Sequence, residues 1–318
     1  MDQAGSRFSA IVVNYNGGTL LTEAVASSVA RGIRPAEVVV VDNGSSDGSL
    51  DGCLERFPGT SGLRNSGNAG FARAANQGLR VAAGEFVLLL NTDARLRPGA
   101  LDAFAAAFDA YPRLAIAGAR LLFPDGRLQN AVAPLPRWWQ EFLPLPLLKL
   151  AASRRFAGKL PAAREPVVVE SVVGAAFAVR RAALAQLGLL DEDFFFFLEE
   201  TYWCRRARLL GFEVRHVPGA EVVHGQGETA RRFHAGARIE YQRSKLLYYA
   251  KAQGRWAAAA VGLVLPVKAL LDGFANGLLV VATLGLSRRQ RARFTTYAVI
   301  LAWHLFGRPS HWGLPGKE

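Results

Sequence analysis

Residues 87–99 read VLLLNTDARLRPG, and this stretch gives a clear indication of the fold. Four apolar residues run directly into the Asn-Thr-Asp triplet of residues 91–93, and Pro98 and Gly99 follow. An apolar run without alternation is typical of a strand that is buried on both faces, as in a parallel sheet covered by helices. We therefore expect a buried strand that ends at a carboxylate, followed by a helix that begins near Pro98.

Three earlier stretches repeat this pattern of a strand followed by a polar, glycine-rich loop and a helix: FSAIVVNYNGG (8–18), AEVVVVDNGSSDGS (36–49) and GLRNSGNAGF (62–71). Ligands of open α/β sheets bind at the carboxyl ends of the strands. The polar residues at these four strand ends should therefore gather along one edge: Asn14, Asp42, Asn65 and Asp93. Taken one at a time, they are also explained by ordinary turn chemistry or helix capping. The helix beginning near Phe71 should offer free backbone N–H groups that suit a phosphate.

Bulk composition excludes several classes of protein. The chain has 318 residues, of which 51% are hydrophobic, enough for one large domain and an appendage. Two cysteines, Cys53 and Cys204, exclude a disulfide scaffold and have no metal-ligand spacing, which favours a reducing compartment. The N-terminus, MDQAGSRFSAIVV, does not resemble a signal peptide.

The positive charge lies almost wholly in the last 90 residues. Residues 1–228 hold 24 Lys/Arg and 23 Asp/Glu, a net charge of +1, whereas residues 229–318 hold 14 and 3, a net charge of +11. Nucleic acid and an anionic membrane surface are the usual partners of such a block. Because these basic clusters flank long apolar segments, the pattern favours a membrane surface and argues against nucleic acid.

This basic region contains two apolar segments, Trp256–Leu286 and Phe294–Phe306. The longest uncharged runs in and just after the first segment are 12 residues (256–267) and 15 residues (273–287), whereas a span needs roughly 18 to 20. This favours helices that lie in the membrane surface or re-enter it. A true span and a soluble helical bundle remain the alternatives.

Seven motifs occur in an order that resembles glycosyltransferase family 2, in the branch that holds bacterial rhamnosyltransferases. They are IVVNYNG, VVVVDNGSSDGS, RNSGNAGFARAANQG, LLLNTDA, VVGAAFAVRRAAL, GLLDEDFFFFLEETYWCRRARLLGF and VRHVPGAEVVHGQGETA. The likeness covers roughly residues 7–250. It implies an α/β protein of the GT-A (Rossmann-like) fold, with a mostly parallel sheet flanked by helices and a C-terminal membrane-associated helical region. The expected domains are a GT-A domain over 1–250, with an insertion at 121–166, and basic, apolar helices over 251–318.

The resemblance also implies an activity. We expect an inverting glycosyltransferase that moves a sugar, rhamnose being the first choice, from a nucleotide-diphosphate donor to a lipid-linked or cell-surface glycan. By the same resemblance, the first choice of donor is dTDP-rhamnose. The expected location is the cytoplasmic face of the bacterial inner membrane, against its anionic surface. A nucleotidyltransferase would need a basic loop after the first strand, which NYNGGTL lacks. The alternative from another class is an inactive, membrane-bound sugar-binding or scaffold protein.

A divalent metal, Mn²⁺ or Mg²⁺, is implied at the end of the 87–91 strand. In the family, an acidic triplet there holds a metal on the diphosphate, which offsets the charge of the leaving group. In this sequence Asp93 supplies the triplet's only carboxylate, and Asn91 offers a neutral oxygen or a hydrogen bond. His224 matches a family position that completes the metal shell, and an imidazole ligand favours Mn²⁺ over Mg²⁺.

Other positions match the family's donor site. Asp42 resembles the residue that accepts a hydrogen bond from the nucleotide base, and Asn14 and Asn16 are expected to line the same pocket. Asn68 and Arg73 belong to the loop near the sugar or diphosphate.

The general base is expected in the segment DEDFFFFLEETYWC. Glu200 falls on the family's base position, next to Glu199, and Tyr202 stands where the family usually has a further acid. A carboxylate beside four phenylalanines would have a raised pKa, which suits a base. The alternative is a purely structural role, in which both glutamates form the solvated first turn of a helix.

The sequence signals for acceptor-binding residues are the least specific of those considered. Trp138 and Trp139, in a Pro- and Leu-rich insertion, could stack on sugar rings, rest on lipid or pack in a surface loop. Gly174, in VVGAAFAVRRAAL, is assigned to the acceptor side by resemblance.

Overall fold

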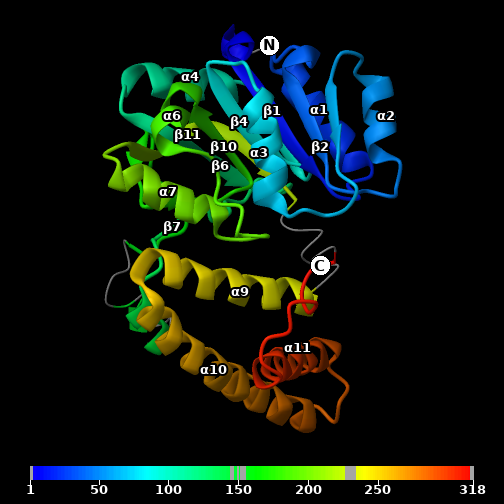
Figure 1. Ribbon diagram of the computed structural model, residues 1–318, viewed down its shortest axis with the longest axis vertical. Coiled ribbons are helices and arrows are strands. Elements are labelled where there is room, and N and C mark those ends of the chain that lie inside the picture. Colours follow the sequence, from blue (N-terminus) through cyan, green and yellow to red (C-terminus); the bar gives the residue numbers. More distant parts are fainter. Residues whose placement is uncertain (1–2, 144–146, 149, 151–154, 226–233, 316–318) are drawn as a thin grey trace. The chain divides into compact units, whose positions relative to one another are not determined.

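The computed structural model describes residues 3–143, 147–148, 150, 155–225 and 234–315 (Figure 1). Its chain forms two units: the first comprises Met1–Leu135, Ala152–Phe195 and Glu199–Gly227, and the second comprises Pro136–Ala151, Phe196–Leu198 and Glu228–Glu318.

A nine-stranded sheet forms the centre of the first unit, in the order β3-β2-β1-β4-β10-β6-β11-β5, with β8 paired to β11 (Figure 1). The strands are β1 (Phe8–Asn14), β2 (Val38–Asp42), β3 (Ser61–Arg64), β4 (Phe86–Asn91), β5 (Ala94–Leu96), β6 (Leu114–Leu122), β8 (Val167–Val168), β10 (Ala176–Arg180) and β11 (Glu213–His224). A separate pair is formed by β7 (Val132–Ala133) and β9 (Ser171–Val172).

The expected parallel arrangement is confirmed for the first four strands. β3, β2, β1 and β4 are mutually parallel, and β6 and β11 run in the same direction. Strands β5, β8 and β10 run the opposite way. Register brings the carboxyl ends together, because Asn14 lies beside Asp42 and Val13 beside Asn91.

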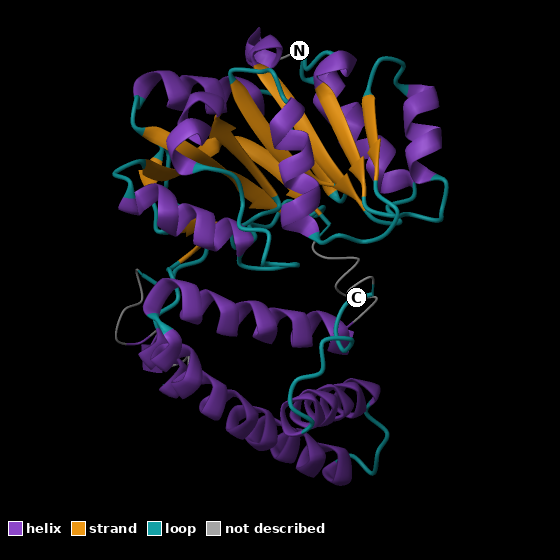
Figure 2. Cartoon of the chain, in the orientation of Figure 1, coloured by secondary structure: helices purple, strands orange, loops and turns teal. Residues whose placement is uncertain are grey.

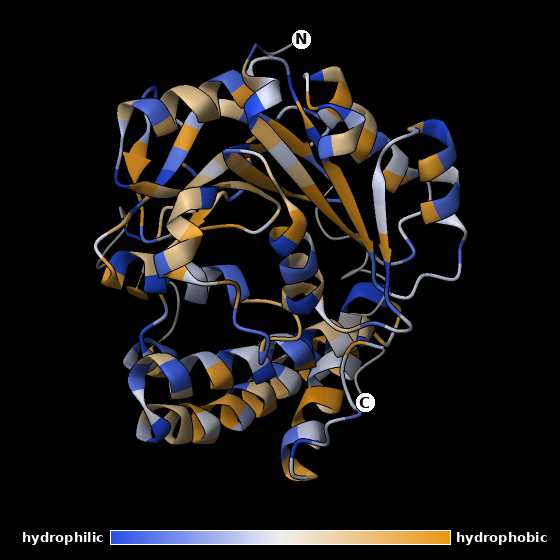
Figure 3. Ribbon diagram, turned by 45° about the horizontal axis from the view of Figure 1, so that its top comes forward, coloured by the Kyte–Doolittle hydropathy of each residue, from blue (hydrophilic) through white to orange (hydrophobic). Residues whose placement is uncertain are grey.

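Helices cover both faces of this sheet, as Figure 2 shows in purple over orange strands. Along β1, Ala10 and Val12 pack on one face with α1, α2 and α4, whereas Ile11 packs on the other with α3, α6 and α7. The helices are α1 (Thr19–Ala30), α2 (Ser49–Arg56), α3 (Phe71–Val81), α4 (Ala100–Ala110), α6 (Leu184–Leu187) and α7 (Glu199–Leu209). The uninterrupted apolar runs follow from this two-sided burial, and Figure 3 shows the central strands orange along much of their length.

The stretch after the opening triplet differs from the expectation in one respect. Strand β5 intervenes between Asp93 and the helix, and pairs antiparallel with the end of β11, so that Ala94 lies beside His224. The helix α4 then begins after Gly99, whose φ of 82° lies in the left-handed region that favours glycine.

The second unit contains η3 (Trp138–Phe142), α9 (His234–Gln253), α10 (Arg255–Ala282) and α11 (Arg288–Leu305). The unit boundary after Gly227 differs from the expected boundary at residue 250. The physical reason is that α9 continues without interruption past residue 250 and packs against α10 and α11.

Helix α10 runs through Pro266 without a break. A proline removes the N–H that would bond the carbonyl four residues earlier, here that of Gly262. The guanidinium of Arg308 supplies the missing donor, with Nη2 2.8 Å from the Gly262 oxygen. By length and composition, α10 is the one helix in the described part of the chain that could cross a membrane.

Candidate active site

The nucleoside end of the site is built where β1 and β2 finish side by side. The Asn14 amide donates to Asp42 Oδ1 at 2.7 Å and to Ser49 Oγ at 2.8 Å. The Ser45 N–H donates to the other carboxylate oxygen of Asp42 at 3.1 Å. Because Asn14 and Asp42 are both buried, these bonds hold the carboxylate in one orientation, as recognition of a base N–H requires.

The loop after β1 lies against the loop after β4. Asn16 takes a left-handed φ of 51°, and its side-chain oxygen accepts from the Ser46 N–H at 2.9 Å. A side chain at Gly17 would come within 2.4 Å of Asn14 Oδ1 and 3.3 Å of Thr92 Cγ2, so only glycine allows this approach. The expected nucleoside residues and the triplet therefore share one edge of the sheet.

Asn43, which the sequence reasoning missed, organises the loop that contains Asn68. Its buried amide donates to Asn68 Oδ1 at 2.7 Å, and its oxygen accepts from the Ala69 N–H at 3.0 Å. The only sequence signal was its place directly after Asp42 in VVVVDNGSS. Asn68 also caps its own loop, because its oxygen accepts from the Gly70 N–H at 3.1 Å.

One expectation about the start of α3 changes. The Phe71 N–H, expected to be free for a phosphate, donates to the Phe195 carbonyl at 2.7 Å. The reason is the close approach of that segment, since a side chain at Gly70 would lie 2.6 Å from the Phe195 oxygen. Arg73 is largely exposed, and its guanidinium faces Glu192 at 3.8 Å.

Asp93 and His224 form the candidate metal pair. The chain turn after β4 and the end of β11 bring Asp93 Oδ1 to 3.3 Å from His224 Nε2, and both residues are buried. Gln129 lies on the other side of the ring, with its Oε1 2.9 Å from His224 Nδ1. The Gln129 amide nitrogen donates to the carbonyls of Leu122 and His224, so its oxygen is left as the acceptor of the Nδ1–H.

The donor set fits a divalent cation. In the neutral ring the proton is held on Nδ1, so the lone pair of Nε2 points at a carboxylate oxygen of Asp93. Two acceptors at this separation need a proton or a cation between them. No group of three or more His, Cys, Asp or Glu side chains in the described residues could hold a metal alone. Diphosphate oxygens and water would therefore complete the shell, as is usual for Mg²⁺ on phosphates.

Gln129 was also missed, and no local pattern points to it, because it lies 95 residues from His224. The glycine-rich loop after His224 lies largely outside the described residues, from residue 226 to residue 233. Asn91 ends β4, and its backbone N–H donates to the Ala175 carbonyl at 3.0 Å.

Glu200 lies in the first turn of α7 and packs on Gly174. A side chain built at Gly174 would stand 3.4 Å from both Cγ and Cδ of Glu200. The next residue, Ala175, accepts a hydrogen bond from Asn91 of the Asn-Thr-Asp triplet. Glu200 therefore packs on the residue adjacent to one that is bonded to the triplet. Gly174 was assigned to the acceptor by resemblance, and its described contact is with Glu200.

Burial raises the pKa of the Glu200 carboxyl, and hydrogen bonds from backbone N–H groups, including that of Gly174, partly offset the rise. Oε2 of Glu200 is shielded from solvent and has no hydrogen-bond partner among the described residues. One turn later in α7, burial raises the pKa of the Cys204 thiol to about 12. Glu200 is thus a shielded carboxyl with one uncommitted oxygen, as a general base requires.

The backbone before α7 is strained. Phe197 and Leu198 both take left-handed φ values, 72° and 67°, which cost of order 1–3 kcal/mol each for such residues. Glu199 is the more buried of the two glutamates, and Tyr202 stacks at a tilt on Phe194 with ring centroids 5.5 Å apart. Strain of this kind persists only where the surrounding structure holds it, and it is concentrated at functional sites.

Trp138 and Trp139 belong to the second unit, in η3. They are 39% and 42% exposed, so neither is a core residue. The backbone N–H of Trp138 donates to Oε1 of Gln253 at 3.0 Å, and the Trp138 ring meets the Phe142 ring edge-on. Their part in binding an acceptor stays a prediction.

Comparisons with known proteins agree with this fold. Residues 9–188 match the family model for glycosyl transferase family 2. An N-acetylglucosaminyl-diphospho-decaprenol L-rhamnosyltransferase of Mycobacterium tuberculosis (strain ATCC 25618 / H37Rv) is 27% identical over 305 residues, which cover 89% of this chain and 96% of that protein.

Solved glycosyltransferases share the architecture. GalNAc-T7 with UDP, GalNAc and Mn²⁺ superposes with a TM-score of 0.55 at 20% identity, covering 77% of this chain and half (50%) of that chain. The mannosyltransferase PcManGT of Pyrobaculum calidifontis, in complex with GDP-Man and Mn²⁺, gives 0.50 at 20% identity, covering 95% and 86%. The expected GT-A fold is confirmed by these neighbours.

Proposed function

We propose that this chain, which belongs to glycosyl transferase family 2, is a metal-dependent, inverting transferase that moves rhamnose from a nucleotide diphosphate to a lipid-linked glycan. The rhamnose and the lipid-linked acceptor are supported by the name of the mycobacterial relative, which matches almost end to end. The metal is supported by the Asp93–His224 pair and by the Mn²⁺ in the solved neighbours. The positive charge of the last 90 residues supports work at the cytoplasmic face of the bacterial inner membrane.

In this proposal Asp42, oriented by Asn14, accepts a hydrogen bond from the nucleotide base. Asp93 and His224 would hold Mn²⁺ or Mg²⁺, which offsets the charge that develops on the departing nucleoside diphosphate. Glu200 takes the proton of the acceptor hydroxyl while that oxygen forms a bond to the anomeric carbon. The bond from that carbon to the diphosphate breaks on the opposite face, so the anomeric configuration inverts.

The observation that carries the proposal is the state of Glu200. Its carboxyl is shielded, its pKa is raised by burial, and it packs on Gly174 beside the residue that bonds Asn91. A carboxylate that only started a helix would sit in solvent with an ordinary pKa. A raised pKa brings the base closer to neutral pH, where proton transfer is most efficient.

The experiment is a transfer assay with a set of nucleotide sugars, a lipid-linked N-acetylglucosaminyl diphosphate, and Mn²⁺ or a chelator. Glycolipid product that depends on metal supports the proposal. The rival is an inactive sugar-binding protein, favoured by the single carboxylate of the triplet and by Tyr202 in place of an acid. Donor binding without either transfer or donor hydrolysis, in every combination, would support that rival.

A further inference from the structure

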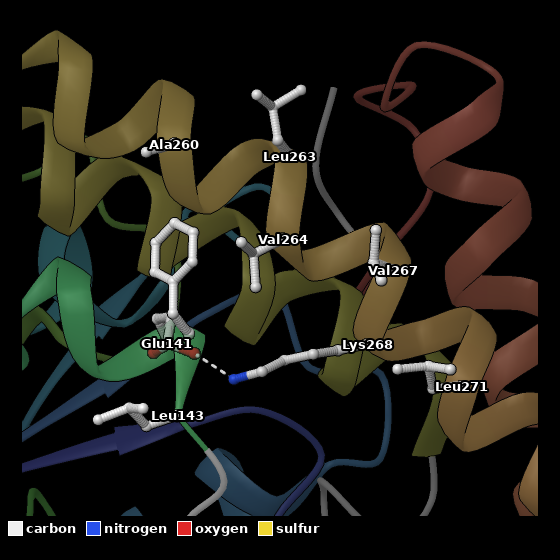
Figure 4. A pocket seen from close by; sticks show the side chains of 9 residues that line it. Glu141, Leu143, Ala260, Leu263, Val264, Val267, Lys268 and Leu271 are labelled. Atoms are coloured by element: carbon white, nitrogen blue, oxygen red, sulfur yellow. Dashed lines mark hydrogen bonds and ion pairs between the residues drawn. The ribbon is translucent and has the colours of Figure 1, made fainter.

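A groove of about 650 Å³ runs along helix α10 within the second unit. On the α10 side it is lined by residues spaced three and four apart, so they form one stripe along the helix. The opposite wall comes from η3 and the residue after it, Phe142 and Leu143. The α10 lining, all of it labelled in Figure 4, is Ala260, Leu263, Val264, Val267, Lys268 and Leu271.

This groove is apolar and largely open to solvent. Leu263 and Leu271 are 75% and 61% exposed, although both are leucines. Exposed aliphatic side chains that form a continuous stripe are typical of a surface that is covered by an apolar partner.

A compact charge cluster with more cations than anions joins the two walls of the groove, because Glu141 lies in η3 and Lys268 in α10. Glu141 Oε1 is 2.9 Å from Lys245 Nζ and accepts a hydrogen bond from Tyr249 at 2.9 Å. Its other oxygen lies 3.3 Å from Lys268 Nζ, the pair marked by the dashed line in Figure 4. One carboxylate therefore faces two ammonium groups, and the cluster has a net charge of +1.

The two lysines differ in what else they can bind. The Lys245 side chain is only 16% exposed, whereas that of Lys268 is 40% exposed and its contact with Glu141 is longer. An ammonium has three donors. Lys268 can therefore meet a second anion at the groove, while Glu141 stays paired with Lys245 and Tyr249.

We propose that this groove holds the isoprenoid chain of the lipid-linked acceptor, with its phosphate group against Lys268. The inference rests on the proposed function, since it takes the acceptor to be lipid-linked. An apolar stripe with a cation on its wall is complementary to a chain that carries one anionic phosphate end. A sugar or a peptide would need more hydrogen-bonding groups than the described lining offers.

The test is calorimetric binding of farnesyl diphosphate to the full chain, with a chelator present so that the metal-dependent donor site does not compete. Farnesol and inorganic diphosphate are titrated in parallel. Wild type should bind farnesyl diphosphate more tightly than inorganic diphosphate, because each buried methylene adds about fourfold in affinity. It should also bind farnesyl diphosphate more tightly than farnesol, because farnesol lacks the phosphate that meets Lys268.

Two variants and two matched controls locate the site. Val264→Trp fills the groove and should weaken binding about 15- to 60-fold, equivalent to two or three methylenes left unburied. Lys268→Gln should weaken it about tenfold or more through the lost charged hydrogen bond. Leu270→Trp, on α10 outside the lining, and Arg291→Gln, an equal loss of charge on α11, should leave binding unchanged.

Three results would overturn the proposal. The first is that wild type binds inorganic diphosphate as tightly as farnesyl diphosphate. The second is that Val264→Trp and Lys268→Gln both bind farnesyl diphosphate as tightly as wild type. The third is that these two variants lose cosedimentation with phosphatidylglycerol vesicles to the same extent as they lose farnesyl diphosphate binding, which would make the groove part of a general membrane surface. The binding assay contains neither donor nor metal, so its result does not depend on whether the transfer reaction occurs. Conversely, intact transfer to a water-soluble acceptor by Val264→Trp would leave the proposed function standing whether or not the groove binds lipid.

Discussion

Replacing Glu200 by glutamine should nearly abolish turnover while leaving donor binding unchanged. Glutamine keeps the length of the side chain and an oxygen that can accept from the Gly174 N–H, but it cannot take a proton. Removal of a general base typically lowers the rate by about 10²- to 10⁴-fold, which raises the barrier by about 2.7 to 5.5 kcal/mol. The hydrogen bonds that orient Asn14 and Asp42, the proposed donor-binding residues, involve no atom of Glu200, so nucleotide affinity should stay the same.

The pH dependence follows from the raised pKa of Glu200, which burial causes. The carboxyl must be ionised to act as a base, so wild-type turnover should fall as the pH drops through this raised pKa. The free energy of unfolding depends on pH in the opposite direction. The folded protein binds the proton more tightly than the unfolded chain, so wild-type stability should decrease as the pH rises from the ordinary glutamate range to the raised pKa. Glu200→Gln should lack this slope.

The assay is initial rate at saturating donor and acceptor, with nucleotide affinity measured by calorimetry and unfolding followed across pH. Glu199→Gln is the matched control, because adjacent helical residues point about 100° apart. A near-normal rate in Glu200→Gln with a large loss in Glu199→Gln would make Glu199 the base. Near-normal rates in both variants would refute the assignment of the base to this helix.

Three further predictions test other parts of the molecule. Asp93→Asn should abolish the Mn²⁺-dependent part of nucleotide binding, and unchanged metal dependence in calorimetry would show that the metal site is elsewhere. Gln129→Ala removes the partner that orients His224, so metal affinity should fall about 10- to 100-fold, whereas metal-free nucleotide binding should not change; an equal loss of both would indicate general damage. Arg308→Met should lower the free energy of unfolding by about 1–3 kcal/mol, because it strands a carbonyl in α10. Adding Pro266→Ala should restore much of this stability in urea titrations, and no recovery would argue against the compensation.

The sheet edge could be predicted from the sequence because its signals are local. A run such as that ending at Asn91 must be buried on both faces, and a parallel sheet then brings the ends of β1, β2 and β4 together. The residues that hold the site in shape could not be found this way. Gln129 reaches His224 across 95 positions, and Phe195 takes the Phe71 N–H only because two distant loops meet at Gly70.

The course of α10 shows the same limit. Pro266 predicts a break in any helix considered alone, because its missing donor leaves a carbonyl unpaired. The helix continues because Arg308, 46 residues after Gly262, supplies the donor. Local sequence rules describe what a segment lacks, and the tertiary fold decides whether another segment provides it.

The proposed activity is metal-dependent transfer of rhamnose with inversion. The most direct measurement is NMR of the product formed from dTDP-rhamnose and a lipid-linked N-acetylglucosaminyl diphosphate, with Mn²⁺ and with a chelator. The proposed activity should yield a rhamnosylated lipid, formed only with metal, whose new glycosidic bond has the anomeric configuration opposite to that of the donor. Retention of the donor configuration, full activity in the chelator, or transfer from other nucleotide sugars but not from dTDP-rhamnose would contradict it.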